Sequence, residues 1–531
     1  MRNCGRLLVA AFLGFSMSVS AEVKLPAVFG DHMVLQRDSA VPVWGWAAPG
    51  EQVTVTSGTV TASTKAGADG KWIVRLPALK AAAAPIELVV AGASNKIVIR
   101  DVLVGDVWVC SGQSNMALQM GQASNAREEL PKANNQAIRF FSIKRKVAFE
   151  PQPDCDGKWS VCTPDSAKGV SAVGYFFIKV IAETQKIPVA LINTHLGATP
   201  AQAWTRLEAL QADSDLKKAY GDRFTQVIAN LDAVKKTHDD WLANGGKDFK
   251  DAQAKFYAAA WQAKQKGLPA PPPPKPPATP EPTHPDDATL PTVLYNGMVA
   301  PLVPFAIKGV IWYQGESNAG QADLYEKLFP ALITDWRKQW GQGDFPFFYV
   351  QLPNYRPRVA QPTEGGWCRL RETQLQTMSK VPNTGMAIAI DVGDANDLHP
   401  SNKAPVGHRL ALLARRNVYG ENIISSGPLY ASHKLAGDKV VITFNHVGQW
   451  MKPAGEVKGF AIAGADNKFV WAQTKVESPN TVSVWSSDVK APAAVRYGWA
   501  DNPEVNLCNS ADLPASPFRI TVETSTKEST Q

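Results

Sequence analysis

Residues 22–100 alternate between apolar and polar side chains in short runs that are separated by Gly, Pro and Asp. The clearest runs are "AVPVWGWAAPGEQVTVTSG", "KWIVRLP", "IELVVAG" and "NKIVIRDV". Successive side chains of a strand point to opposite faces of a sheet, so this period of two is typical of half-buried antiparallel strands. The pattern predicts a small N-terminal β-sandwich domain over residues 22–100.

From residue 101 the apolar runs are short and no longer alternate. Buried parallel strands have this pattern because helices cover both faces of their sheet. Helical spacing lies between the runs, in 323–340, 369–381 and 405–420. We interpret as strands the runs 102–110, 188–194, 307–314, 345–352 and 385–392. Strands alternating with helices predict an α/β domain with a doubly wound parallel sheet over residues 101–420, whose ligand would bind beyond the carboxyl ends of the strands.

Two further segments complete this division of the chain. Residues 206–290 interrupt the α/β pattern with an Ala-, Lys- and Asp-rich helical part that leads into "LPAPPPPKPPATPEPTHPDD". We interpret them as an insertion, a helical hairpin followed by an extended proline-rich spacer. Alternation returns in "DKVVITFNHV" and "TVSVWSS", which predicts a C-terminal β region over residues 421–531.

Composition and charge narrow the classes of function. The 531 residues are 45% hydrophobic and carry a formal charge of +7, but the Lys and Arg residues are scattered and form no basic block. This excludes a dedicated nucleic-acid surface. Arg2 and Arg6 precede an apolar stretch and small residues before Ala21, which predicts a signal peptide over residues 1–21. No later segment has about 18 unbroken apolar residues, so we expect an exported protein, periplasmic or secreted, without a membrane span.

The cysteines and histidines give no sign of a metal site. The spacing contains neither CxxC nor HxxxH, so we expect no metal and no cofactor. An oxidising compartment permits disulfides, and Cys155 and Cys162 are close enough in sequence to form one. The amino-acid sequence does not specify an oligomeric state.

Small or polar residues with possible roles in catalysis follow four of the predicted strands. They are Ser114 in "SGQSNM", Gly197 in "INTHLGATPAQAW", Asn318 in "IWYQGESNAG", and Asp394, Asp397 and His399 in "GDANDLHPSNKAPVGHRLA". Each alone has an ordinary explanation, such as a helix cap or a tight turn. Parallel strands bring their carboxyl ends to one edge of the sheet, so we expect these residues to meet there.

Together these residues match the requirements of a serine esterase. A neutral hydroxyl is a weak nucleophile, so His399 would take the Ser114 proton as general base. Asp397 or Asp394 would orient the imidazole. The oxyanion would bind the backbone N–H groups of Ser114 and Gly197 and the side-chain amide of Asn318.

The same motifs resemble the SGNH hydrolase superfamily, specifically the sialate O-acetylesterase-like carbohydrate esterases. "GQSNM" resembles the nucleophile block, "QGESN" the block with the oxyanion Asn, and "DLHP..K..VGHRLA" the His block. The resemblance implies a flavodoxin-like doubly wound sheet with flanking β-sandwich regions, and a Ser114–His399–Asp397 acyl-enzyme mechanism. Its Gly block more often has a Gly pair, where this chain has Ala198.

The acid and the nucleophile each have an alternative. The superfamily often has Asp three residues before the His, where this chain has Asn396. Asp397 is therefore our first choice and Asp394 the second, and a dyad without an acid stays open. Ser111 is the alternative serine, but it lacks the "GQSN" context, and Cys110 ends an apolar strand.

The resemblance implies an acetylated carbohydrate as substrate. Gln113, Gln314 and Glu316 are the side chains that we expect to bind sugar hydroxyls. Trp204, Trp312 and Tyr313 would stack on a ring or belong to the core. O-acetylated sialic acid and plant hemicellulose (xyloglucan or xylan) both stay open, and no basic cluster is dedicated to a sialate carboxylate. A non-catalytic carbohydrate-binding protein and a lipase or thioesterase are the alternatives from other classes.

Overall fold

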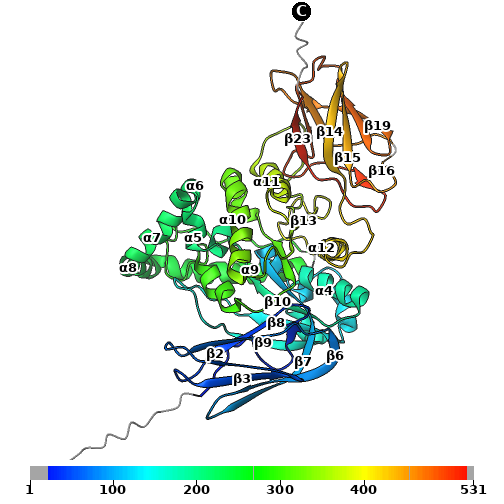
Figure 1. The fold of residues 1–531 in the computed structure, drawn as a ribbon. Helices are drawn as coiled ribbons and strands as arrows, with labels where there is room; N and C mark the ends of the chain where they lie inside the picture. The colour runs from blue at the N-terminus through cyan, green and yellow to red at the C-terminus, as the bar shows by residue number, and fades with distance from the viewer. Residues whose placement is uncertain (1–21, 267, 454, 523–531) are drawn as a thin grey trace, which may run out of the picture.

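The computed structural model describes residues 22–266, 268–453 and 455–522. The predicted signal peptide, residues 1–21, lies outside the described residues. In Figure 1 the N-terminal strands lie below a central α/β region and the C-terminal strands lie above it. Among the described residues, no helix is both long and apolar enough to span a membrane.

The N-terminal region consists of mostly antiparallel strands around a shared apolar core, and its first strand, β1, pairs in parallel with β7 (Lys96–Gly112). Its strands are β1 (Val34–Gln36), β2 (Val41–Trp46), β3 (Gln52–Ser57), β4 (Val60–Lys65), β5 (Lys71–Leu76) and β6 (Ala82–Ala91). β2 pairs with β5, and β3 pairs with β4 and β6. Trp72, Val74 and Leu76 of β5 are buried while the residues between them are exposed, as the alternating pattern predicts.

One long strand joins this region to the central sheet. β7 (Lys96–Gly112) pairs antiparallel with β6 near its start and parallel with two central strands near its end. The division that we predict between residues 100 and 101 therefore falls inside a continuous strand. The apolar core is also continuous across it.

The central sheet has the order β13-β12-β11-β7-β10-β8-β9. Its other strands are β8 (Asn135–Ile143), β9 (Gly157–Cys162), β10 (Val189–His195), β11 (Gly309–Tyr313), β12 (Phe347–Val350) and β13 (Thr384–Ala387). Along this spatial order, every neighbouring pair between β13 and β8 is parallel. The edge strand β9 pairs antiparallel with β8. The fold is thus mixed α/β with one large mixed sheet and additional smaller sheets.

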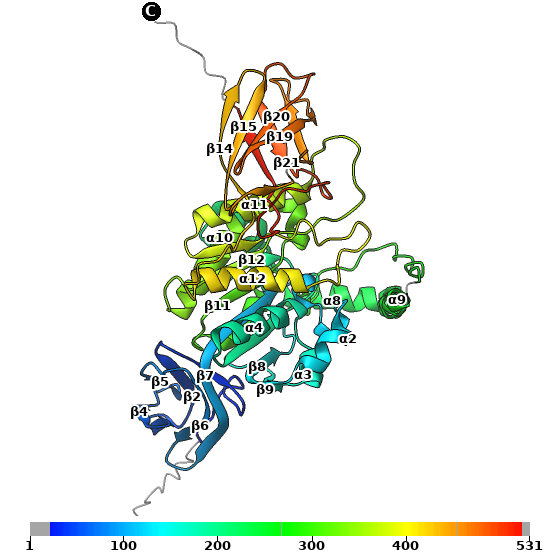
Figure 2. The same ribbon diagram turned by 90° about the vertical axis from the view of Figure 1, so that its right-hand side faces the viewer.

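Helices cover both faces of this sheet (Figures 1 and 2). The main ones are α4 (Ala172–Gln185), α10 (Ala322–Trp340), α11 (Gly366–Lys380) and α12 (Ala404–Asn417). On β12, Phe347 packs against Trp336 of α10 with ring centroids 6.1 Å apart. The next residue, Phe348, stacks on Trp108, which packs against Phe177 of α4. Neighbouring residues thus contact helices on opposite faces, which explains the unbroken apolar runs.

The remaining helices are short or belong to the insertion. The short ones are α1 (Ser114–Ala117), α2 (Ala126–Glu129) and α3 (Pro164–Lys168). The insertion contains α5 (Leu207–Gln211), α6 (Ser214–Leu216), α7 (Asp222–Ala229), α8 (Leu231–Trp241) and α9 (Lys247–Gln265). Residues 268–290 contain no helix or strand. The composition of residues 206–290 thus agrees with helices followed by an extended segment.

The C-terminal region has its own apolar core. Its strands are β14 (Leu429–Ala436), β15 (Lys439–Asn445), β16 (Met451–Lys452), β17 (Phe460–Ala463), β18 (Val470–Trp471), β19 (Gln473–Ser478), β20 (Thr481–Trp485), β21 (Ala494–Tyr497), β22 (Cys508–Asn509) and β23 (Phe518–Thr521). They form two four-stranded sheets and one short pair. Buried Arg371 of α11 connects this region to the α/β region, because it donates to the backbone oxygens of Leu352, Ala500 and Asp501.

The structure has no disulfide between Cys155 and Cys162. Both are free, buried thiols, as are Cys110 and Cys368, and Cys508 is free and half-buried. The reason is that Cys162 is the last residue of β9, whose first residue, Gly157, follows Cys155 by only two positions. The five extended steps from Gly157 to Cys162 span roughly 17 Å, so the two steps from Cys155 to Gly157 cannot bring the thiols to the separation that a disulfide can join.

Candidate active site

Three neighbouring strands end at the same level of the central sheet. The register pairs Gly112 of β7 with His195 of β10 on one side and with Tyr313 of β11 on the other. Gly112 has φ +135°, and a Cβ there would lie 2.1 Å from the Tyr313 carbonyl oxygen. Only glycine fits this position, which lets β7 turn directly into α1. Ser114 and Gly197 each follow two residues after the paired positions.

Ser114 and His399 form the central contact of the site. Ser114 is the first residue of α1, and His399 lies in the loop between β13 and α12. Ser114 Oγ and His399 Nε2 are 2.8 Å apart, which is hydrogen-bonding distance. A second histidine, His195, lies nearby, but burial lowers its pKa to about 4. His195 is therefore neutral near pH 7, and neither of its ring nitrogens has a hydrogen-bond partner among the described residues.

The two candidate acids lie in the same loop as His399. Asp397 Oδ1 accepts a hydrogen bond from the backbone N–H of His399 at 2.9 Å. Asp394 Oδ1 accepts one from the backbone N–H of Asn396 at 2.7 Å. Asp397 thus contacts the residue that it would orient, whereas the bond of Asp394 shapes the turn before it.

Gly197 lies directly beside the serine. A Cβ on Gly197 would lie 3.5 Å from the Ser114 Cβ, so the main chains of the two loops are neighbours. The next residue, Ala198, has φ +59°, the left-handed region that glycine adopts at lower cost. This backbone conformation explains why a second glycine suits position 198.

Asn318 lies deeper than Ser114 and is fully buried. Its Oδ1 accepts hydrogen bonds from the Ala201 backbone N–H (2.9 Å) and from Gln314 Nε2 (2.7 Å). Its Nδ2 donates to Gln202 Oε1 at 3.0 Å. These bonds fix the amide orientation and hold the loop after β10 against the loop after β11.

A buried polar network links the serine segment to the histidine loop. Asn115, next to Ser114, donates to the carboxylate of Glu316 and to the backbone oxygen of Leu398. Buried Lys403 donates to Asn115 Oδ1. Desolvation raises the pKa of Glu316. Because Leu398 precedes His399, Asn115 fixes the loop with Ser114 and the loop with His399 relative to each other. Sequence reasoning missed Asn115 and Lys403, although both lie inside the motifs it used.

The other predicted residues are mostly buried. Gln113 accepts hydrogen bonds from the backbone N–H groups of Gly315 and Ser317, and Gln314 binds Asn318. With Glu316 bound to Asn115, all three side chains predicted to contact sugar form hydrogen bonds to neighbouring loops in this structure. Trp204, Trp312 and Tyr313 are fully buried core residues, and so is Ser111. Burial raises the pKa of the Cys110 thiol to about 12, so it stays protonated.

Ser114 and His399 open into a cavity of about 810 Å³. One side, which we call the catalytic wall, consists of Ser114, Ala117, Leu118, Gln122, Gly197, Asp394, Asn396, Asp397 and His399. The opposite side, the insertion wall, consists of Tyr257, Ala260, Trp261, Leu268 and Ala270. Sequence reasoning missed this second wall. The only signal was the spacing of Tyr257 and Trp261, which places both on one face of α9.

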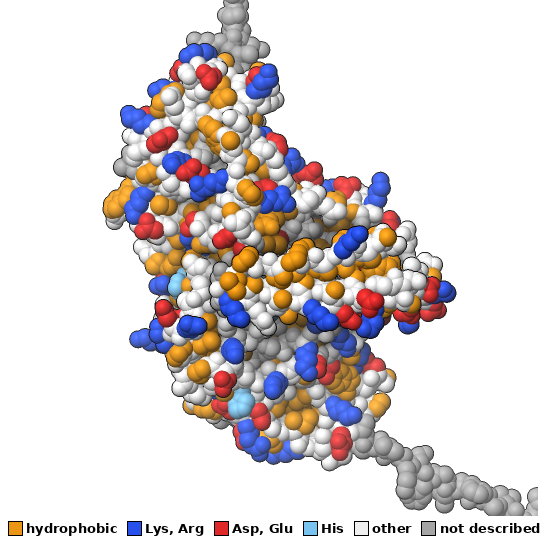
Figure 3. All heavy atoms as spheres, turned by 180° about the vertical axis from the view of Figure 1, so that it is seen from behind, with side chains coloured by type: hydrophobic (Ala, Val, Ile, Leu, Met, Phe, Trp, Pro, Cys, Tyr) orange, Lys and Arg blue, Asp and Glu red, His pale blue; other side chains and the backbone are white. Residues whose placement is uncertain are grey.

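The arrangement suits acyl transfer. An imidazole nitrogen in contact with a serine hydroxyl can take its proton as the oxygen attacks a carbonyl carbon. The cavity gives a carbonyl compound access to that oxygen from solvent. Figure 3 shows Lys and Arg interspersed with Asp and Glu on the face that it displays, so that face has no continuous basic surface.

Comparisons with known proteins agree with this chemistry. The family described as carbohydrate esterase, sialic acid-specific acetylesterase, matches residues 104–245 and 289–415. Sialate O-acetylesterase of Rattus norvegicus is 30% identical, and the match covers 98% of this chain and 98% of the rat protein. Sialate O-acetylesterase of Homo sapiens is also 30% identical, and the match covers 96% of this chain and 95% of the human protein. The crystal structure of a carbohydrate acetylesterase from Xanthomonas citri has a TM-score of 0.77 and 35% identity, over 94% of this chain and 99% of its own. The predicted resemblance is thus confirmed, and the chain is a carboxylic ester hydrolase that belongs to the sialic acid-specific acetylesterase family of carbohydrate esterases.

Proposed function

We propose that this protein is an exported serine esterase that removes O-acetyl groups from carbohydrates through an acetyl-enzyme at Ser114. The observation that carries this proposal is the 2.8 Å contact between Ser114 Oγ and His399 Nε2 in an open cavity. Export rests on the residue pattern of the first 21 positions.

The reaction has two halves. Ser114 Oγ attacks the acetyl carbonyl carbon while its proton passes to His399 Nε2. The tetrahedral intermediate collapses, the bond to the sugar oxygen breaks, and that oxygen takes the proton from His399. Water then gives a proton to His399 and attacks the acetyl-serine. Collapse of the second intermediate releases acetate and returns the proton to Ser114.

Asp397 is the proposed acid of the triad. Its Oδ1 already accepts the backbone N–H of His399, and in the proposed mechanism the carboxylate also stabilises the imidazolium that forms in each half-reaction. Asp394 is the second candidate. Acetate release by Asp397→Asn and by Asp394→Asn distinguishes the two candidates. Loss of activity in Asp394→Asn alone would make Asp394 the acid.

The proposed oxyanion hole uses the backbone N–H groups of Ser114 and Gly197, both of which line the cavity. Asn318 is the proposed third donor. One hydrogen of its Nδ2 is donated to Gln202 Oε1, and the second hydrogen of that nitrogen would donate to the oxyanion as charge develops. One donor of this kind changes turnover by about 10²–10³-fold.

We also propose that the sheet is of the SGNH, flavodoxin-like type. Without the edge strands β8 and β9, the spatial order is β10-β7-β11-β12-β13. In chain order this is 2-1-3-4-5, the flavodoxin-like arrangement. The order places the strand that delivers Ser114 between those that deliver Gly197 and Asn318.

The cavity favours a neutral sugar at the reacting acetyl group. Its described lining residues include Asp394 and Asp397 but neither Lys nor Arg. A sialate carboxylate there would meet negative charge and no cationic partner. An acetylated hemicellulose such as xyloglucan or xylan therefore competes with the O-acetylated sialic acid that the names of the relatives indicate.

Acetate release from an O-acetylated sialoside and from acetylated xyloglucan tests the function. We expect acetate from at least one substrate in the wild type, loss of release in Ser114→Ala, and normal release in the buried control Ser111→Ala. Full activity of Ser114→Ala on every substrate would refute the proposal. Binding of both polysaccharides without any acetate release would instead favour a non-catalytic carbohydrate-binding protein.

A further inference from the structure

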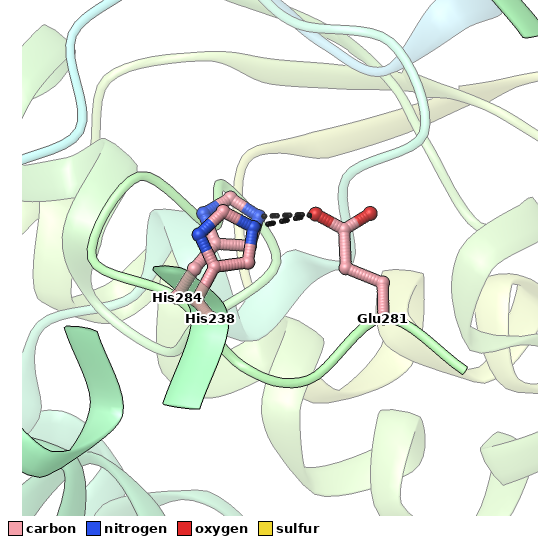
Figure 4. A group of neighbouring side chains, drawn as sticks. All are labelled: His238, Glu281 and His284. Carbon is pink, nitrogen blue, oxygen red and sulfur yellow. Dashed lines mark hydrogen bonds and ion pairs between the residues drawn. The ribbon is translucent and has the colours of Figure 1, made fainter. Parts of the chain in front are cut away.

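Two histidines and a glutamate of the insertion converge on one point away from the catalytic wall. His238 lies on α8, and Glu281 and His284 lie on the extended proline-rich segment. Figure 4 shows the two imidazoles stacked, with their Nε2 atoms directed at the same carboxylate oxygen. The ring centroids are 4.4 Å apart. The sequence hides this cluster because 43 residues separate His238 from Glu281.

The distances in the cluster suit a tetrahedral metal ion. His238 Nε2 is 3.1 Å from Glu281 Oε1, and His284 Nε2 is 3.4 Å from the same oxygen. Ligand bonds of about 2.0–2.1 Å at tetrahedral angles place neighbouring donor atoms about 3.3 Å apart. The three donor atoms all lie within 4.8 Å of one another. A small movement would therefore bring all three around one ion.

The donor set also selects a class of metal. Two imidazole nitrogens and one carboxylate oxygen suit zinc and similar transition metals, whereas magnesium and calcium prefer oxygen ligands alone. The side chains of His238, Glu281 and His284 are 13%, 33% and 17% exposed, respectively. Water can therefore reach the site and supply a fourth ligand.

A cation already competes for the carboxylate. Lys250 Nζ on α9 lies 2.6 Å from Glu281 Oε1. Its side chain is 39% exposed, so it can move to the other carboxylate oxygen or into solvent when an ion binds. The ammonium group thus lowers metal affinity without closing the site.

We propose that His238, Glu281 and His284 form a binding site for a divalent transition metal of the zinc class. The ion would fasten the proline-rich segment to α8, where Trp241 Nε1 already donates to the Thr279 backbone oxygen at 2.9 Å. The same segment begins with Leu268 and Ala270 of the insertion wall. Metal binding would therefore stabilise the wall opposite Ser114 and take no part in the chemical step.

Zinc stoichiometry of the full chain tests the site directly. The protein is stripped with a chelator, incubated with zinc chloride, separated by gel filtration and analysed for zinc per chain. We expect one bound zinc in the wild type and none at this site in His238→Gln, Glu281→Gln or His284→Gln. The controls His433→Gln and His399→Ala should retain the wild-type value. Because the readout is metal content, it does not depend on the proposed esterase activity.

Three further measurements support the interpretation of the zinc content. Cobalt in place of zinc should give the intense visible absorption of a tetrahedral site in the wild type, and circular dichroism should show that the variants are folded. Lys250→Met should bind zinc several-fold more tightly, because it removes the competing ammonium. Absence of zinc from the wild type, or the same zinc content in all three folded ligand variants, would overturn the proposal.

Discussion

The two walls of the cavity around Ser114 are built in different ways. The catalytic wall comes from loops that follow parallel strands in register, and buried hydrogen bonds such as those of Asn318 and Asn115 hold it. The insertion wall comes from one helix and an extended segment, and Tyr257 and Leu268 are 62% and 57% exposed. The matched family region includes the first wall and omits residues 246–288, which contain the second.

This contrast indicates that the two walls have different functions. A wall locked by buried hydrogen bonds can hold reacting atoms in place, as transition-state stabilisation requires. A wall with exposed aromatic and apolar side chains can bind a sugar ring without affecting the chemistry. We therefore expect substitutions in the catalytic wall to change kcat and those in the insertion wall to change KM.

The largest effect is expected at His399. His399→Ala removes the group that accepts the Ser114 proton, so kcat should fall by about 10⁴-fold or more. Ser114→Ala combined with His399→Ala should be little worse than either alone, because the two side chains act as a unit. Steady-state acetate release measures both. Multiplicative losses in the double variant would show that the residues act independently.

Asn318 should give the next largest effect. Asn318→Asp keeps the acceptor oxygen that holds Ala201 and removes the donor, so kcat should fall by about 10²–10³-fold with little change in KM. Ser317→Ala is the matched control in the same loop, with an exposed side chain, and should retain kcat. If Asn318→Asp lowers the melting temperature but leaves kcat unchanged, the residue is structural only.

His195, at the end of β10 beside the catalytic wall, should make the free energy of unfolding depend on pH. Its pKa is about 4 when folded and near 6.5 when unfolded, so the unfolded chain binds a proton first as pH falls. The free energy of unfolding should then fall by about 2 kcal/mol between pH 7 and pH 5 from this residue. His195→Leu should lose this part of the pH dependence in denaturant titrations. An identical pH dependence in the variant would show that His195 is not held neutral by burial.

The smallest effect is expected in the insertion wall. Tyr257→Ala should raise KM for a polysaccharide about fivefold to tenfold and leave kcat unchanged, because only ring stacking is lost. Tyr257→Phe keeps the ring and should behave as wild type. A fall in kcat in Tyr257→Ala would erase the difference between the two walls.

The sequence predicted that Ser114, Gly197 and His399 meet, because apolar runs and the motifs that follow them are local signals. Ser114, Gly197 and His399 each follow an apolar run, and parallel strands bring such positions to one edge. The roles of Gln113 and Gln314 could not be predicted in this way. A polar residue after a strand can face the ligand or turn inward to bind the backbone, and only the packed loops decide.

The insertion wall and the metal cluster depend on contacts between segments that are distant in sequence. Tyr257 lines the same cavity as Ser114, and His238 meets Glu281, because of how α8, α9 and the proline-rich segment fold relative to one another and to the Ser114 loop. The composition predicted helices followed by an extended segment but carried no register between them. The continuous strand β7 is a similar case, because a change in periodicity at residue 101 resembled a domain boundary.

The central claim is that Ser114 is the nucleophile and that His399 activates it. A fluorophosphonate probe reacts covalently with activated serines, and peptide mass spectrometry locates the modified residue. The account predicts one modified residue, Ser114, with labelling lost in Ser114→Ala and strongly slowed in His399→Ala. Labelling at Ser111 or another residue, or equal labelling rates in wild type and His399→Ala, would contradict it.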